Sequence, residues 1–191
     1  YEYERYLEEI SLKFSWGDAE LWRERADLRV KRMEQSMWNE ERGWFFDYNF
    51  EKECQSEVAA LSGILPMYAG MVDKKKAEKM RENLANFELK HGIAVMESLP
   101  GAENYQWAYP NVWPPMVYVT VFALHRYGFD KDASRIARKY INTTVNLFEK
   151  TGQLWEKVDG NTGEVAGGEY EAAPMIGWSA GVFLAMLDFI D

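Results

Sequence analysis

The chain has 191 residues, which is enough for one domain with its own hydrophobic core. Its formal net charge of −9 excludes a nucleic-acid binder, which needs a basic face, and disfavours an anionic membrane surface. Hydrophobic residues make up 47% of the chain and aromatic residues 15%, so it is not disordered, and its Trp and Tyr side chains suit both a core and the flat faces of sugars.

Apolar residues recur at helical spacing along most of the chain. The clearest stretch runs from Ala133 to Phe148, where apolar side chains mark one face at every turn. Two short turns, Gly17-Asp18 and Gly128-Phe129-Asp130, separate neighbouring helices and place an Asp as a helix N-cap. In chain order we predict about seven helices, at residues 1–14, 18–38, 57–72, 73–88, 114–127, 132–149 and 176–190.

The other connectors are long and rich in aromatic residues, Gly and Pro, at residues 39–56, 89–113 and 150–175. Long loops in a compact domain are usually functional or disordered, and these are too aromatic for disorder. The run Trp44-Phe45-Phe46-Asp47-Tyr48 predicts a short strand or hairpin arm. We therefore expect the functional residues on the side of the long loops.

Short turns at one end of the helices and long loops at the other predict an all-α fold. The expected architecture is stacked αα-hairpins of the α/α-toroid (six-hairpin barrel) type, with a few short strands in long loops, as a single domain over residues 1–191. A closed toroid needs about twelve helices, so about seven leave it incomplete and expose a large apolar side. We expect a missing N-terminal segment or a second chain to complete the barrel.

The chain offers little for metal or redox chemistry. Cys54 is its single cysteine, so no disulfide forms within the chain and a cytoplasmic location is favoured. Cys54, His91 and His125 lack the spacing of metal ligands. No signal peptide or membrane span is visible in the sequence. We predict no metal, no cofactor, and no nucleic-acid or membrane partner.

The loop that precedes residue 114 concentrates aromatic, amide and proline side chains, from Tyr105 to Pro115. Prolines stiffen the backbone, and amides supply both the donors and the acceptors that neutral sugar hydroxyls require. The alternative interpretation is a rigid packed corner. We predict that this loop contacts a small sugar through Gln106, Trp107, Asn111 and Trp113.

A second segment carries two carboxylates. Glu156 follows two apolar residues, so one of its faces can be buried, and a buried carboxylate can act as a base or be retuned as an acid. Further along, Gly167-Gly168 permits close approach of a ligand, and Glu169 follows directly. The alternative is that both are ordinary surface glutamates beside a turn.

Together these segments resemble the inverting trehalase family of glycoside hydrolases. The family motif Gln-Trp-Asp-x-Pro-x-Gly-Trp-x-Pro departs from this chain at Ala108 and Val112. Three further family motifs, Glu-Lys-Tyr-Asp, a glycine-rich Glu-Tyr and Gly-Trp-x-x-Gly-Val, resemble residues 156–159, 167–170 and 177–182. Residues 38–48 and 65–68 also look like the family, and the matches hold their order over nearly the whole chain. The first motif matches at Gln106, Trp107, Pro110, Trp113 and Pro115.

The resemblance implies an α/α six-hairpin barrel that hydrolyses an α-glucosidic bond with inversion. Glu156 takes the position of the catalytic base, which activates the attacking water, and Glu169 that of a carboxylate contacting the sugar. Gln106, Trp107 and Trp178 match residues near the pocket. Inversion also needs a second carboxylic acid, roughly 6.5–9.5 Å from the base. In the family this acid belongs to a Gly-Trp-Asp-Phe-Ser motif that would precede this chain, as would the substrate-binding arginines.

Other interpretations remain open. Ala108 stands where the family has Asp, which weakens the case for trehalose itself, and related α/α-barrel α-glucosidases and mannosylglycerate-type hydrolases are the second choice. The chain could instead be a non-catalytic fragment or pseudoenzyme that binds sugar, or one half of a split enzyme. A purely structural helical scaffold ranks last, because it gives no reason for the Gln-Trp and Gly-Gly-Glu-Tyr segments.

Overall fold

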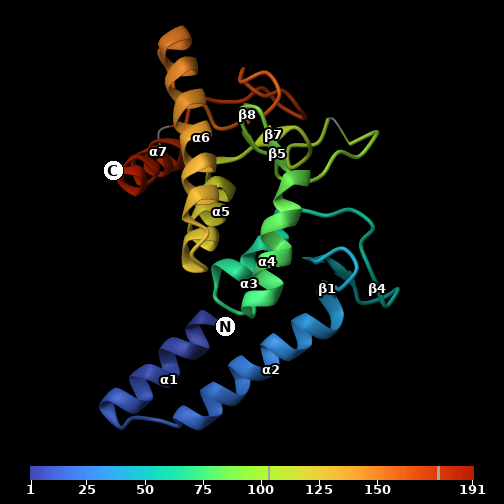
Figure 1. Ribbon diagram of the computed structural model, residues 1–191, viewed down its shortest axis with the longest axis vertical. Helices are drawn as coiled ribbons and strands as arrows, with labels where there is room; N and C mark the ends of the chain where they lie inside the picture. The colour runs from blue at the N-terminus through green and yellow to red at the C-terminus, as the bar shows by residue number, and fades with distance from the viewer. Residues whose placement is uncertain (103, 176) are drawn as a thin grey trace.

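The computed structural model of the chain describes residues 1–102, 104–175 and 177–191. Helices dominate it, as the periodicity predicted (Figure 1). The helices of the described residues are α1 (Glu2–Phe14), α2 (Ala19–Met37), α3 (Leu65–Tyr68), α4 (Lys74–Asn83), α5 (Pro114–Arg126), α6 (Asp130–Thr151) and α7 (Gly177–Ile190), with 3-10 turns η1 (Leu61–Ile64) and η2 (Leu84–Asn86).

Most helices begin and end close to where the sequence predicts. Asp18 caps α2, since its side chain accepts a hydrogen bond from the Leu21 backbone N–H at 3.1 Å. Two prolines open α5, where a missing N–H costs nothing. Gly152 ends α6 in the left-handed conformation, with φ of 68°. The predicted first residue of the last helix, Ile176, lies outside the described residues.

The predicted helix over residues 57–72 is wrong in its length, because only η1 and α3 are helical there. The residues before η1 are extended and pair with another segment instead. The Leu61 N–H donates to the Val95 carbonyl at 2.7 Å, and the Glu97 N–H donates to the Ala59 carbonyl at 3.1 Å. The Glu97 carboxylate also accepts from the Ala59 N–H at 2.8 Å. These long-range partners outweigh the local helical preference.

Short antiparallel strand pairs lie in the connectors. The pair formed by β1 (Trp38–Asn39) and β2 (Trp44–Phe45) confirms the hairpin arm predicted there. The pairs of β3 (Tyr48–Asn49) with β4 (Cys54–Gln55), and of β5 (Glu88–Leu89) with β6 (Gly92–Ile93), also join strands that are close in sequence. The pair of β7 (Asn111–Val112) and β8 (Val158–Asp159) is not local, because it joins two long loops far apart in sequence.

The core is built by α5, α6 and α7, which pack against one another, and by the α3–α4 region beside them. Val117, Val121 and Leu124 of α5 are fully buried. Trp44 lies at the other side of the core, with its ring 5.0 Å from that of Phe87. Figure 1 shows the loops that carry β5, β7 and β8 gathered at one end of this body. These loops belong to two of the three predicted long connectors, whereas the third, which carries β1 and β4, lies elsewhere in Figure 1, so the predicted separation of short turns and long loops holds only in part.

The α1–α2 hairpin extends away from that body in Figure 1. Charged side chains lie between its two helices, and apolar side chains lie on the outside of α1. The side of α1 that meets α2 is charged: Arg29 donates two hydrogen bonds to Glu4, at 2.7 and 2.8 Å, and Arg23 donates one to Glu8 at 2.7 Å. An apolar stripe lies exposed on α1 at spacings of three, four and four residues. We call it the α1 stripe, and its members are Tyr3, Tyr6, Ile10 and Phe14.

The bidentate pair between Glu4 and Arg29 predicts an acid-sensitive hairpin. The hydrogen bonds from Arg29 lower the pKa of Glu4 from 4.5 to about 2, against the opposing effect of burial. Because the folded-state pKa lies below the unfolded one, the stabilisation is complete above pH 4.5 and is lost as the pH falls towards 2. We expect Glu4→Gln to lower the free energy of unfolding by about 0.5–1 kcal/mol at pH 7, and by less at pH 3.

Urea denaturation of both proteins at several pH values measures this difference. Glu9→Gln, a change at an exposed residue of the same helix, is the matched control and should leave stability unchanged. A Glu4→Gln penalty that stays constant from pH 7 to pH 3 would show that the ion pair is not its source.

The α1 stripe predicts self-association of the purified chain. Four apolar side chains on one exposed helix face form a patch that soluble monomers normally cover. We expect sedimentation velocity to show dimers or larger species at micromolar concentration, and Tyr6→Glu together with Phe14→Glu to restore the monomer. A compact wild-type monomer at that concentration would contradict the prediction.

Candidate active site

Three segments meet at the long-loop end of the fold. Strand β7 pairs with β8, with Val112 opposite Val158, so the loop before α5 lies beside the segment after α6. A third segment joins them, because the Glu156 N–H donates to the Ala173 carbonyl at 3.0 Å, and the Met175 N–H donates to the Leu154 carbonyl at 2.7 Å. The residues predicted separately from the two motif regions are thus brought together.

Nearly every polar atom of Gln106 forms a hydrogen bond within this junction. Its backbone carbonyl accepts from the Asn111 amide at 3.0 Å and from the Trp113 indole N–H at 2.9 Å. Its backbone N–H donates to the Glu169 carboxylate at 3.4 Å. Its side-chain oxygen accepts from the Lys157 ammonium group. The side-chain nitrogen Nε2 is buried and has no hydrogen-bond partner among the described residues.

The three tryptophans predicted for the site form one aromatic cluster. Trp107 and Trp113 are stacked, with centroids 4.4 Å apart and planes 6° apart. Trp178, on α7, meets Trp113 edge-on at 5.5 Å. Trp113 is only 2% exposed, whereas Trp107 is 51% and Trp178 37% exposed. The outer two rings are therefore open to a ligand, and Trp113 supports them from beneath.

Asn111 is held in place by hydrogen bonds with the backbone and does not face solvent. It lies in β7, is buried, and gives its side-chain amide to the Gln106 carbonyl. Ala108 is also buried and accepts the Asn111 backbone N–H at 2.9 Å. Both residues shape the turn that carries Gln106 and Trp107.

Glu156 lies at the centre of the junction and is 8% exposed, as the apolar residues before it predicted. Its Oε2 atom is buried without a hydrogen-bond partner in the described part of the chain. An orphaned carboxylate oxygen is costly, so such an atom in a folded protein usually has a partner such as a ligand or water. Glu156 and Gln106 thus offer one free acceptor and one free donor.

Glu169 is exposed, beside Gly168, whose φ of 132° lies in a region that favours glycine. Tyr170 follows it. Desolvation raises the pKa of Tyr170, as do its interaction with the Glu156 carboxylate and the charge of Glu169. The glycine-rich turn therefore sets a carboxylate and a phenol beside the buried Glu156.

Sequence reasoning missed Lys157. It is 0% exposed, and its Nζ lies 4.6 Å from the centroid of the Tyr170 ring and 5.7 Å from that of Trp113. Desolvation lowers the pKa of Lys157, while the Glu156 and Glu169 carboxylates act in the opposite direction. The sequence offered one signal of its importance, because Lys157 lies within a segment that resembles a family motif. Lysines are almost never fully buried without partners, so the burial seen here points to a specific role.

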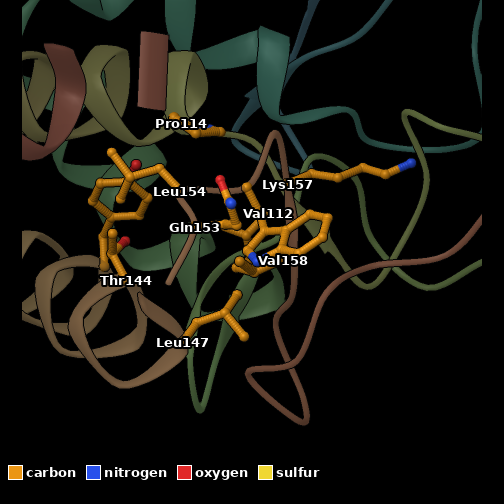
Figure 2. A pocket seen from close by; sticks show the side chains of 10 residues that line it. Val112, Pro114, Thr144, Leu147, Gln153, Leu154, Lys157 and Val158 are labelled. Carbon is orange, nitrogen blue, oxygen red and sulfur yellow. The ribbon is translucent and has the colours of Figure 1, made fainter. Parts of the chain in front are cut away.

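A cavity next to this junction is too small for a sugar. It is lined by residues such as Val112, Leu147 and Leu154 and measures about 10 Å³, room for at most a single water. Figure 2 shows the Lys157 side chain leaving it, with the nitrogen pointing away from Thr144 and Leu147. The ammonium group therefore belongs to the Gln106 side of the junction.

Within the ranges that the structure covers, no helix is long and apolar enough to cross a membrane. The same ranges contain no group of three or more His, Cys, Asp or Glu side chains arranged to hold a metal ion.

The chain resembles known proteins over its whole length. The trehalase family profile matches residues 1–191. A periplasmic trehalase of Salmonella choleraesuis is 29% identical over 86% of this chain, which spans only 29% of that relative's length. The structure of neutral trehalase from Saccharomyces cerevisiae has a TM-score of 0.80 at 26% identity, and the match covers 91% of this chain and 31% of that one.

A second solved structure supports the fold alone. The GH63 mannosylglycerate hydrolase from Thermus thermophilus, in complex with glucose, has a TM-score of 0.70 at 21% identity and covers 96% of this chain and 44% of that one. These likenesses confirm the predicted α/α-toroid class. Because the family profile matches the chain from end to end, and a trehalase sequence and a trehalase structure agree with it, the protein belongs to the trehalase family.

Proposed function

We propose that this chain carries the base and part of the sugar pocket of an inverting glycoside hydrolase that cleaves an α-glucosidic bond. One observation carries the proposal: Glu156 Oε2 and Gln106 Nε2 are buried side-chain atoms without partners among the described residues. One accepts and the other donates, which complements a water molecule or a sugar hydroxyl. Family membership supports the same assignment.

In this proposal Glu156 is the general base. Its carboxylate takes a proton from a water molecule while the water oxygen bonds to the anomeric carbon, and the bond from that carbon to the leaving oxygen breaks. A second carboxylic acid gives its proton to the leaving oxygen from the opposite face, roughly 6.5–9.5 Å away. We expect that acid, and the completing helices of the toroid, from a segment or partner chain outside these 191 residues, since the chain spans 29% of a related trehalase.

The sugar is held by the surrounding groups. The exposed rings of Trp107 and Trp178 offer flat faces for a pyranose ring. Gln106 donates to one hydroxyl and Glu169 accepts from another, while Asn111 and Trp113 hold the loop in place. Trehalose is the first candidate substrate. The buried methyl group of Ala108 offers no polar contact, so other α-glucosides and glycosylglycerates follow closely.

A sugar-binding chain without turnover is the second candidate. The exposed α1 stripe favours it, because the stripe indicates that the chain needs another segment or a partner before the toroid is complete. In this case the Glu156 site binds a monosaccharide but lacks the acid. The predicted cytoplasmic location stays a prediction, since a related trehalase is named periplasmic.

Glucose release from trehalose and from a panel of α-glucosides tests the proposal. The purified chain is assayed alone and after fusion to the N-terminal part of a trehalase domain, with wild-type protein and Glu156→Gln in parallel. Release that depends on Glu156 supports the enzyme. Glucose binding without release in either form supports the second candidate, and neither binding nor release would reject both.

A further inference from the structure

We propose that Lys157 is a positioning residue: it fixes the side-chain amide of Gln106 so that the NH₂ group, and not the oxygen, faces a sugar hydroxyl. The inference deepens the proposed sugar site and rests on it for the identity of the ligand. The orientation itself follows from the chemistry of the two side chains.

A lysine ammonium group has three donors and no acceptor. The Gln106 amide has an oxygen that only accepts and a nitrogen that only donates, so only the oxygen can face Lys157 Nζ. The nitrogen must then point the other way. With a neutral hydroxyl in place of the ammonium group, either orientation of the amide would be allowed.

The ammonium group is itself held in place. Its full burial is compensated by the faces of Trp113 and Tyr170 and by the charges of Glu156 and Glu169. No carboxylate among the described residues forms a direct ion pair with Lys157, so its hydrogen bond goes to the amide. Burying a cation against a neutral amide costs free energy. A side chain that only filled space here could be a methionine, which would avoid that cost.

The free nitrogen is buried next to Gly168, which has no side chain. A Cβ atom on Gly168 would stand only 3.2 Å from Gln106 Nε2, so any larger residue would crowd the position of a hydrogen-bond partner for this nitrogen. Every other polar atom of Gln106 has a partner from Lys157, Asn111, Trp113 or Glu169. The geometry therefore presents one NH₂ group, with its two N–H donors, in a fixed direction, and a sugar hydroxyl oxygen is a suitable acceptor.

The first test needs no sugar. Lys157→Met removes the ammonium group and keeps a side chain of similar length. The ¹H–¹⁵N heteronuclear NOE of the Gln106 side-chain amide, assigned by its absence in Gln106→Glu, measures the order of the group. We expect an ordered amide in the wild type and a mobile one in Lys157→Met. An amide equally ordered in both proteins would overturn the inference, whatever the sugar assays show.

The second test is a double-mutant cycle on sugar binding. Gln106→Glu replaces the free nitrogen with an oxygen and adds a negative charge that can pair with Lys157, so its melting temperature should not fall. We expect each single variant to weaken glucose or trehalose binding by about tenfold, and the double variant to lose little more than Gln106→Glu alone. Losses that multiply would show that Lys157 does not act through Gln106.

The two tests separate the possible failures. If Lys157→Met does not fold, the Gln106→Glu melting temperature still decides, because a marked drop would mean that Lys157 does not pair with a carboxylate at this position and would overturn the inference. If the amide loses its order in Lys157→Met but no protein binds any sugar, the positioning role stands and the proposed function fails. If sugar binds well and the amide order does not change, the positioning role fails alone.

Discussion

Glu156→Gln is expected to abolish glucose release in a preparation that turns over trehalose or another α-glucoside. Removing a general base costs about 10²–10⁴-fold in rate. The free energy of unfolding should change by less than about 1 kcal/mol, because the amide has nearly the same shape and Oε2 has no hydrogen bond to lose among the described residues. The charge that Lys157 loses as a neighbour is offset because a neutral amide costs less to bury than a carboxylate. Initial rates and urea denaturation of the same samples measure both quantities.

Two further glutamates serve as controls for Glu156. Glu164→Gln alters an exposed carboxylate that pairs with Lys150, away from the aromatic cluster, and should retain full activity. Glu169→Gln should raise KM more than it lowers kcat, since Glu169 is proposed to hold the sugar and not the water. A Glu156→Gln protein that keeps most of its activity would remove this residue from the mechanism.

Trp113→Ala is expected to give the largest loss of stability in the site region, about 3–5 kcal/mol. The ring is almost completely buried, and it contacts Trp107 and Trp178. Its N–H also holds the Gln106 carbonyl. The variant thus loses packing, an aromatic stack and a buried hydrogen bond together.

The neighbouring ring provides a matched comparison. Trp107→Ala removes the same side chain from the exposed side of the stack, so it should cost under about 1.5 kcal/mol of stability while it weakens sugar binding. Thermal denaturation of both variants, followed by circular dichroism, gives the comparison. Equal losses at the two positions would show that burial is not what distinguishes them.

The helices were predictable because their signals are local. Apolar spacing and an Asp N-cap placed α2. Periodicity alone placed α6, because the Asp N-cap predicted in the turn before it is wrong: Asp130 lies inside the helix and Phe129 takes the N-cap position without a side-chain hydrogen bond.

The region of residues 57–72 was not predictable in the same way. There the backbone of Ala59 and Leu61 pairs with Val95 and Glu97, residues more than thirty positions away. A periodic pattern carries no information on such a partner.

The candidate site was predictable as a set of residues but not as a division of roles. The motifs singled out Gln106, Trp113 and Glu156, and the structure brings them together. That Trp113 supports the loop from below, while Trp107 faces outward, depends on which side of a stacked pair meets the core. The importance of Lys157 depends on its complete burial, which adjacent residues in a sequence cannot show.

Helix α1 has its charged side against α2 and its apolar side exposed, and this arrangement determines how the protein responds to ionic strength. The Arg23–Glu8 and Arg29–Glu4 pairs that join α1 to α2 are each 2.7 Å long, which is shorter than the Debye length of about 3 Å at 1 M salt, so salt screens them little. Excluded salts such as sulfate strengthen the burial of apolar side chains. Added sulfate therefore strengthens the adhesion of the α1 stripe to another surface while the close ion pairs keep α1 on its own hairpin, so association between chains grows with sulfate without unfolding the hairpin.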